Sequence, residues 1–502
     1  MPPGLIPRII MPTRLPAAVA LLVTIATLVP SQANAQSPTR EEAIAAMHRA
    51  VRFFRTHCSA GGGYIFRLSA DLKKREGEGK VGNTTAWLQP PGTPSVGMAY
   101  TTAFQLTQDQ EVKEAALATA QALIQGQLQS GGWYHRIDFA PEDRARFAYR
   151  VDDVPSDNRR QVNQTTFDDD KSQSAARFLM HLDHTLNFQQ PAVHEAATYA
   201  VDAFVKAQYA NGAWPQRYTD FPDPQAHQPR QASIPKNWSR TYPKRDYKGD
   251  YTLNDNSISD VITTMLLAWD IYGKPRYFDA ACHGGDFFLL AQLPAPQPGW
   301  AQQYNDQMQP AWARKFEPPA VTGGESQGVL RTLLLLYQRT GKSKFLTPIP
   351  SALAYYRSSQ LPSGKLARFY ELGTNKPLYF TKDYQLTYSD ADMPTHYSFQ
   401  VGSNLARIQP DYDKLAAGKK QSSQSDIVPK RQPPAAPDVS PSKSLTLQAA
   451  ACIQALDERG AWVEAGRMRH QGDSDDTTDV IESRTFCRNL VILARYIAAS
   501  AP

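Results

Sequence analysis

Three consecutive aspartates stand directly before a run of apolar residues at helical spacing, in the stretch TTFDDDKSQSAARFL at 165–179. Like charges on adjacent residues repel one another, so Asp168, Asp169 and Asp170 need either solvent or a cation. One or two carboxylates favour the positive end of a helix dipole, and three exceed that need. The stretch is therefore either a helix N-terminus that faces solvent or a set of ligands for a cation.

A second oxygen-rich cluster, Asn254-Asp255-Asn256, occupies the same place before another apolar-periodic run, in YTLNDNSISDVI at 251–262. If the two clusters lie in neighbouring helical hairpins, their oxygen atoms face each other. Hard oxygen ligands of this kind suit Ca²⁺, and suit Mg²⁺ less well. Each cluster alone is typical of a helix cap, whereas the pair together predicts a metal or catalytic site as an equal alternative.

Three cationic side chains on expected loops are candidates for holding an anion. Arg314 precedes Glu317 and a Pro-Pro pair, so it either pairs with that local carboxylate or meets a ligand. Arg368 and Lys382 follow in ARFYELGTNKPLYFTKD, and an arginine can grip a carboxylate through two parallel hydrogen bonds.

Tryptophans follow glycines at Trp133, Trp214 and Trp300. Such rings either stack on the faces of sugars or pack inward as part of the core, and packing inward is the commoner fate. We keep Trp214 as a candidate contact for substrate.

The elements that must position these residues are helices. Apolar stripes at helical spacing occur at 41–57, 111–124, 172–186, 193–209, 257–271, 275–292, 324–338 and 484–498. Between helix pairs a glycine beside an aromatic recurs, in GGGYIF, GGWYHR, NGAWPQRY, PGWAQQY, SGKLARFY and RGAWVE. We expect each glycine to cap the second helix of a pair and the aromatic to turn inward. Helix pairs repeated at this scale predict an all-α fold, an α/α toroid whose ring is possibly incomplete, with long irregular loops on one rim. Coincidental helix caps beside core aromatics are the alternative.

Three segments interrupt the repeat. Residues 136–165 and 219–250 are polar and loop-like, and long loops in a compact domain are usually functional or disordered. Residues 410–443 are rich in Pro, Ser and Lys and are expected to be mobile. The helical pair at 444–499 that follows is expected to pack into the same domain.

The N-terminus has the three-part layout of a secretory signal peptide. Arg8 and Arg14 precede an apolar run over 15–29, and Ala33-Asn34-Ala35 ends in a cleavage site. We expect residues 1–35 to be removed and residues 36–502 to form a single catalytic domain, secreted or periplasmic, monomeric and without a membrane span.

Charge and motif content exclude several function classes. The formal net charge of +6 includes no dense Lys/Arg run, which argues against nucleic acid and is compatible with an anionic polymer. No HExxH, GxSxG or Walker spacing occurs. The four cysteines are too few for a disulfide scaffold, and an oxidising compartment permits a Cys452–Cys487 bond without showing one.

Six motifs, taken in order, resemble the series of the family-10 polysaccharide lyases, the pectate or pectic acid lyases. They are TFDDDKSQSAARFL, NGAWPQRY, YTLNDNSISDVI, GWAQQY, ARKFEPPAVTGGESQGVLR and ARFYELGTNKPLYF. The resemblance runs from about Gly131 to Phe380. It implies an α/α toroid and Ca²⁺-dependent β-elimination of polygalacturonate, the acidic backbone of pectin.

The resemblance also implies roles for single residues. Asp168 and Asp255 fall where the family has calcium-associated aspartates. Asp169 or Asn254 is expected as a further calcium contact, and Asn254 is also a candidate contact for substrate. Arg314 falls on the catalytic base. Arg368 and Lys382 fall on cations that hold substrate carboxylates. Lys171 departs from the family's pattern, because it adds a positive charge beside the expected cation.

Two other functions use the same residues. An inverting glycoside hydrolase on an α/α toroid would use carboxylates about 6.5–9.5 Å apart as general acid and general base, without calcium. A non-catalytic polysaccharide-binding protein would keep the aromatics while the DDDK cluster had lost the metal.

Overall fold

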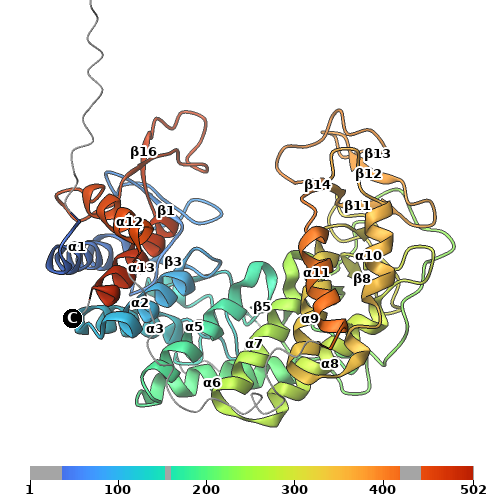
Figure 1. The fold of residues 1–502 in the computed structure, drawn as a ribbon, viewed down its shortest axis with the longest axis horizontal. Helices are drawn as coiled ribbons and strands as arrows, with labels where there is room; N and C mark the ends of the chain where they lie inside the picture. The colour runs from blue at the N-terminus through green and yellow to red at the C-terminus, as the bar shows by residue number, and fades with distance from the viewer. Residues whose placement is uncertain (1–36, 153–159, 419–441, 501–502) are drawn as a thin grey trace, which may run out of the picture. The chain divides into compact units, whose positions relative to one another are not determined.

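The computed structural model describes residues 37–152, 160–418 and 442–500 (Figure 1). Residues 38–502 group into one compact unit, distinct from residues 1–37. The predicted signal peptide and most of the predicted mobile segment 410–443 lie outside the described residues. None of the described helices combines the length and apolar character that a membrane crossing requires.

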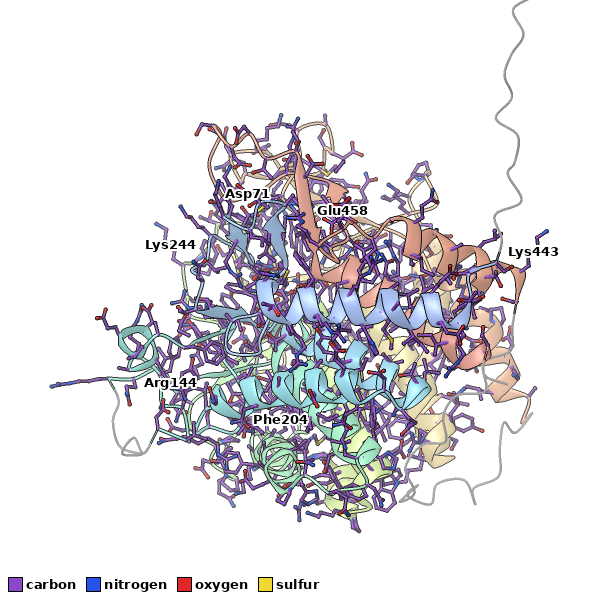
Figure 2. The ribbon with its side chains drawn as sticks, turned by 90° about the vertical axis from the view of Figure 1, so that its left-hand side faces the viewer. Asp71, Arg144, Phe204, Lys244, Lys443 and Glu458 are labelled. Carbon is purple, nitrogen blue, oxygen red and sulfur yellow. The ribbon has the colours of Figure 1, made fainter. Side chains whose placement is uncertain are left out.

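Helices pair into successive hairpins with an inner and an outer layer. The inner helices pack in the order α13 (Ser483–Ala499), α2 (Thr93–Thr107), α5 (Lys171–Thr185), α7 (Ser257–Tyr272), α9 (Glu325–Thr340) and α11 (Leu405–Ala416). The outer helices are α1 (Arg40–Phe53), α3 (Gln110–Gln125), α6 (Pro191–Lys206), α8 (Pro275–Ala291), α10 (Ile349–Ser358) and α12 (Lys443–Gln454). Figure 2 shows α1 and α3 of this outer layer side by side. The predicted α/α toroid class is confirmed.

Short antiparallel ladders fasten neighbouring hairpins at one end. A short strand stands before each inner helix from α2 to α9 and before α13. This strand pairs with a second short strand, which lies at or just after the end of a glycine–aromatic motif. The pairs are β3 (Thr85–Trp87) with β4 (Arg136–Asp138), β5 (Thr165–Thr166) with β6 (Arg217–Tyr218), β7 (Tyr251–Thr252) with β8 (Gln303–Tyr304), β9 (Ala320–Thr322) with β11 (Phe369–Glu371), and β16 (Asp479–Glu482) with β1 (Arg67–Ser69). The last pair joins the two ends of the chain. The ladders hold the loops before the inner helices at one rim.

The remaining small elements also lie in the connecting loops. They are the strands β2 (Arg75–Glu76), β10 (Leu366–Ala367), β12 (Pro377–Phe380), β13 (Leu386–Thr387), β14 (Gln400–Val401) and β15 (Glu464–Ala465), the short helix α4 (Pro141–Arg144), the π-helix η1 (Phe54–Cys58) and the 3-10 turns η2 (Asp168–Asp170), η3 (Asn254–Asn256) and η4 (Ser343–Phe345).

The motif glycines Gly131 and Gly212 form β-turns, and the expectation that they cap the outer helices is wrong. Helix α3 ends at Gln125 with Gly126 as its cap, whereas Gly131 lies five residues later with φ +110°. Its N–H donates to the carbonyl of Leu128 over 2.9 Å. Gly212 repeats this turn with φ +91°, and its N–H donates to Tyr209. A left-handed φ is the reason that glycine recurs here.

The motif tryptophans turn inward, as the repeat predicts. The Nε1–H groups of Trp133, Trp214 and Trp300 donate over 2.8 Å to the carbonyls of Leu123, Phe204 and Phe288. Each of these carbonyls lies in the last turn of an outer helix, where the regular ladder of backbone hydrogen bonds ends, and the carbonyl of Leu123 also accepts from the N–H of Gly126. The tryptophan therefore satisfies the helix end that the glycine was expected to cap.

All eight predicted helical stripes are helices, and five helices among the described residues, α2, α4, α10, α11 and α12, lie outside these stripes. Helix α2 is buried on most sides, so its sequence is apolar all round and shows no amphipathic face. Helices α10 and α11 were also not expected. The prediction that 410–443 is mobile is wrong for 410–416, because α11 continues through Pro410 and buries Leu415.

The loop prediction for 219–250 agrees with the structure, in which this fully described segment contains no helix or strand. The four cysteines are free thiols, so Cys452 and Cys487 are not bonded to each other.

Candidate active site

Two acidic turns share one backbone conformation at the rim. The turns η2 and η3 connect a ladder strand to the helices α5 and α7. Their second and third residues adopt left-handed backbone, with φ of 49° and 60° at Asp169 and Asp170 and of 50° and 59° at Asp255 and Asn256. Asp and Asn tolerate this region better than other non-glycine residues. The two clusters therefore occupy equivalent places in neighbouring hairpins, as predicted.

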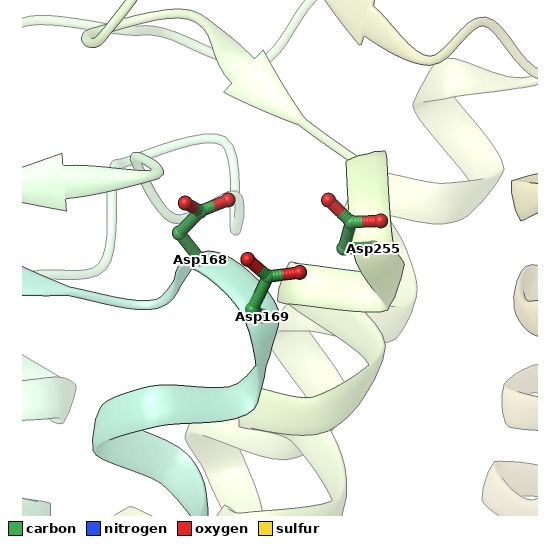
Figure 3. A group of neighbouring side chains, drawn as sticks. All are labelled: Asp168, Asp169 and Asp255. Atoms are coloured by element: carbon green, nitrogen blue, oxygen red, sulfur yellow. The ribbon is translucent and has the colours of Figure 1, made fainter. Parts of the chain in front are cut away.

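Three carboxylates from these turns converge. One oxygen each of Asp168, Asp169 and Asp255 lies within 4.8 Å of the other two (Figure 3). Burial is the main cause that raises the pKa of Asp255 to about 7, and the charge of Asp169 adds to it. The group has the hard donors and the excess negative charge that suit a divalent cation.

Lys171 lies inside this carboxylate group. Its Nζ is 3.0 Å from Asp169 Oδ2 and 3.5 Å from Asp168 Oδ2, and its side chain is 3% exposed. The ammonium balances one of the negative charges. It therefore competes with any added cation for the same oxygen atoms.

Amide and guanidinium groups hold the carboxylates in place. Gln216, next to β6, donates to one oxygen of Asp168 over 2.9 Å, and Arg217, on β6, donates to the other over 3.2 Å. Asn254 Nδ2 donates to Asp255 over 2.6 Å, and Asn254 in turn accepts from Gln302. Asn254 thus orients a carboxylate of the group.

Arg314 forms the local pair that the sequence left open. Its Nε and Nη2 donate to Glu317 over 2.7 Å and 2.5 Å. Burial of the guanidinium lowers its pKa, but the hydrogen bonds and charge of Glu317 outweigh burial, so that the pKa of Arg314 is raised above its ordinary value. The positive charge of Arg314 also lowers the pKa of Asp255 and so offsets part of the rise that burial causes. The two groups therefore interact electrostatically.

Arg368 is joined to Arg314 through a tyrosine. Its Nη1 donates to Glu325 over 2.8 Å and to the hydroxyl of Tyr397 over 3.3 Å. That hydroxyl donates to Glu317 over 3.1 Å. The centre of the Tyr397 ring lies 4.6 Å from the guanidinium of Arg368 and 5.5 Å from the guanidinium of Arg314. One side chain therefore positions both arginines.

Two of the predicted contacts lie elsewhere. Lys382 forms an exposed ion pair with Asp392 over 3.2 Å and has no contact with the carboxylate group among the described residues. Trp214 is 1% exposed and its ring lies in the core, so the predicted sugar contact is wrong for this residue.

Sequence reasoning missed Tyr397, Glu325, Gln302 and Tyr247. Tyr247 comes from the 219–250 loop, and Glu317, Arg314, Arg217 and Asp168 all act on its pKa, which burial raises. Glu325 and Gln302 lie inside the motifs ARKFEPPAVTGGESQGVLR and GWAQQY, whereas no local motif marks Tyr397 or Tyr247. Gln216 and Gln302 occupy equivalent positions shortly after a motif tryptophan. This repeated position was a signal in the sequence that Gln302 belongs to the site.

Replacing Tyr397 with phenylalanine is expected to lower kcat/KM of this site about tenfold while the fold is retained. The ring stays in contact with both guanidinium groups, but Arg368 and Glu317 lose a shared hydroxyl that is worth about 1 kcal/mol per hydrogen bond. Steady-state kinetics check this result. Tyr388→Phe is the control, because its hydroxyl contacts Glu371 outside the site. Equal kinetics of the two variants would contradict the positioning role.

The pH dependence of stability should contain a contribution from His135, which lies near Lys171. Burial, followed by the charge of Lys171, lowers the pKa of His135 to about 4 from its ordinary value near 6.5. The folded state therefore disfavours the protonated imidazole. The stabilisation of the folded state by neutral His135 is complete above about pH 6.5 and is lost as the pH falls toward 4.

Denaturant titrations at pH 7 and pH 5 test this expectation by comparing the native chain with His135→Gln. The variant should lose less stability on acidification. An equal loss in both proteins would show that His135 does not contribute.

Comparison with known proteins gives one family and several structures. Residues 127–366 match the family model described as pectic acid lyase. No curated protein matches the chain. A family 10 polysaccharide lyase from Cellvibrio cellulosa matches with 20% identity and a TM-score of 0.45, over 64% of this chain and 97% of that one. An aspartate-to-alanine mutant of that lyase, in complex with trigalacturonic acid, matches with 19% identity and a TM-score of 0.43, over 66% and 99%.

A third structure is the cellobiose 2-epimerase from Spirochaeta thermophila, with 13% identity, a TM-score of 0.40 and coverage of 91% of this chain and 96% of that one. The assignment depends on the family match and not on these structural likenesses. The resemblance predicted by the motif series is confirmed, because residues 127–366 match the pectic acid lyase family, and this match supports a polysaccharide lyase.

Proposed function

We propose that the protein is a secreted, Ca²⁺-dependent pectate lyase that cleaves polygalacturonate by β-elimination. The observation that carries this proposal is the convergence of Asp168, Asp169 and Asp255, from two hairpins, within the region that matches the pectic acid lyase family. The resemblance of the motifs supplies the substrate class and the reaction.

The residues present fit a calcium ion. Three carboxylates offer hard oxygen donors at mutual distances of up to 4.8 Å, and the pKa of Asp255 is raised first by burial and then by the negative charges of Asp169, Glu325 and Asp168. Asp168, Asp169 and Asp255 would hold the ion. When bound, Ca²⁺ neutralises the negative charge that builds on a uronate carboxylate during proton removal.

The chain's own residues must then orient the substrate and move a proton. Elimination removes the C5 proton, forms the C4–C5 double bond and breaks the C4–O bond, whose electrons and a proton go to the departing sugar. Arg368 is held by Glu325 and Tyr397, and the remaining face of its guanidinium can bind a carboxylate. Lys382 stays a candidate only for a more distant sugar, since it lies on an exposed ion pair.

The resemblance assigns the base to Arg314, and the pair with Glu317 works against that role. A guanidinium has an ordinary pKa above about 12, and Glu317 raises the pKa of Arg314 further. Nε and Nη2 of Arg314 both donate to Glu317, whereas Nη1 forms no hydrogen bond with a described residue. That nitrogen is the one we assign to the substrate.

The geometry favours this reaction over the hydrolytic alternative. An inverting hydrolase needs two carboxyl groups about 6.5–9.5 Å apart, with room for water between them. In this group one oxygen of each carboxylate lies within 4.8 Å of one oxygen of each of the others, which is closer than that spacing.

Incubation of the mature protein with polygalacturonate, with Ca²⁺ or with chelator, tests the proposal. Calcium-dependent ultraviolet absorbance of an unsaturated uronide is the expected result. New reducing ends without that absorbance would identify a hydrolase. Binding without cleavage would identify a polysaccharide-binding protein.

Lys171 sets the calcium affinity in this proposal. Lys171→Met should tighten calcium binding about tenfold, because the ammonium no longer competes for Asp168 and Asp169. Calorimetric titration with CaCl₂ measures the change, with the exposed Lys342→Met as the control for loss of a charge. Weaker binding in Lys171→Met than in the control would show that the ammonium supports the site.

Export is the remaining part of the proposal. The layout of residues 1–35 supports a cleaved leader and a mature enzyme that begins at Gln36. N-terminal sequencing of the protein from periplasmic and extracellular fractions tests the cleavage point, and a mature chain that retains Arg8 would contradict it.

A further inference from the structure

A cavity of about 850 Å³ lies at the rim beside the strands β1, β2 and β16. Its wall includes Phe66, Arg67 and Glu76 from the N-terminal part and Arg469, Glu482 and Arg484 from the C-terminal part. The ladder of β1 with β16 brings these two ends of the chain together. Every lining residue lies outside 127–366 and outside the carboxylate group.

The cavity adjoins the proposed active site through His396. This residue lines the cavity, and its ring packs against Phe316 at 5.1 Å between centroids. The guanidinium of Arg314 lies 4.8 Å from the same Phe316 ring. Ring contacts through Phe316 and His396 therefore connect Arg314 with the cavity wall.

Most of the carboxylates in the wall are engaged within the protein. Glu482 accepts from Arg67 Nε over 2.5 Å, and Glu464 accepts from the Thr485 hydroxyl over 2.6 Å. Glu76 is 2% exposed and accepts the backbone N–H groups of residues 469 and 470 over 2.8 Å and 2.7 Å. Glu76 thus fixes the backbone from which the Arg469 side chain projects.

The groups left available in the wall are mainly cationic. Arg469 and Arg484 are exposed, and neither forms an ion pair with a described residue. Two imidazoles, His396 and His470, are also exposed there, against the single exposed carboxylate of Glu78. Arg484 lies at the first turn of the 17-residue helix α13, whose dipole adds positive potential.

We propose that this cavity is a distal subsite that binds carboxylates of an acidic polysaccharide through Arg469 and Arg484. Guanidinium groups bind carboxylates bidentately, and three of the four glutamates in the wall are already held by hydrogen bonds within the protein. The subsite rests on the proposed function for the identity of the polymer. It gives long chains a second anchor that short oligomers cannot reach.

Binding in the presence of chelator tests the subsite without requiring catalysis. The mature full chain and the Arg469→Ala/Arg484→Ala double variant are titrated calorimetrically with polygalacturonate and with trigalacturonate. The double variant should bind the polymer at least about tenfold more weakly, since a single hydrogen bond between charged groups can account for that factor. Affinity for the trimer should not change.

Arg331→Ala/Arg407→Ala is the matched control, because it removes two exposed arginines on α9 and α11 that are absent from the cavity wall. Thermal melting verifies that all variants are folded. Unchanged polymer affinity in the Arg469/Arg484 variant would overturn the proposal. If the native chain binds a fully methyl-esterified polymer as tightly as the acidic polymer, and loses that binding in the Arg469→Ala/Arg484→Ala variant, the acidic ligand class is overturned.

Activity measurements separate this proposal from the proposed function. With Ca²⁺ present, the double variant should show a raised KM for polymer and an unchanged kcat for short oligomers. A protein that binds polymer through the cavity and forms no unsaturated product refutes the lyase alone. A lyase whose double variant keeps its polymer affinity refutes the subsite alone.

Discussion

Arg314→Ala is expected to lower kcat on polygalacturonate by about 10²–10⁴-fold, the usual contribution of a positioned proton-transfer group. KM should change little if Arg314 acts on the C5 proton, because Arg368 still binds the substrate carboxylate. Initial rates of ultraviolet absorbance across substrate concentrations measure both constants. A raised KM with an unchanged kcat would make Arg314 a binding cation instead of the base.

The fold of this variant needs a control, because Glu317 is 1% exposed and would lose its partner. A buried carboxylate without its cation destabilises a protein by about 3–5 kcal/mol. The Arg314→Ala/Glu317→Gln double variant removes that burden and should regain stability without regaining activity. Glu317→Gln alone keeps Arg314 and lessens the rise of its pKa, so it should retain part of the turnover.

Asp255→Asn is expected to weaken calcium binding by about 10²-fold, because affinity of such sites depends on the number of charged ligands. Activity should then require correspondingly higher calcium. Asp279→Asn, on the exposed surface of the outer helix α8, controls for the loss of one negative charge. An unchanged calcium titration in Asp255→Asn would refute the ligand role.

The same variant has a second readout that needs no activity. Asp255 has a pKa of about 7 in the folded protein, above its ordinary value of 3.8, so the folded state binds the proton more strongly than the unfolded chain. Without calcium, this residue therefore lowers stability as the pH rises from about 4 through 7. Calcium-free Asp255→Asn should be more stable than the native chain at pH 8, and calcium should stabilise it less. Lower stability at pH 8 would contradict this account.

The sequence predicted those parts of the site that depend on neighbours along the chain. Asp168 and Asp255 each stand at the entry of a striped helix, so their equivalence followed from the repeat of strand, acidic turn and helix. The pair of Arg314 with Glu317 was also foreseeable, because three residues separate them. Such features arise from local backbone geometry, which a short stretch of sequence specifies.

Distant contacts escaped the sequence. Tyr397 reaches Glu317 from 80 residues away, and no motif around it indicates which arginines it contacts. The same holds for the cavity, whose arginines come from both ends of the chain and meet through the ladder of β1 with β16.

By itself, the amino-acid sequence determined the helical hairpins, the order of the family's motifs and the two acidic turns, because periodicity and turn chemistry act over a few residues. Only the tertiary structure decided which way side chains point. Trp214 faces the core and caps a helix end, Lys171 folds back onto Asp169, and Lys382 remains on the surface. These outcomes depend on packing between hairpins, where burial and charge balance are set by residues that lie far apart in the chain.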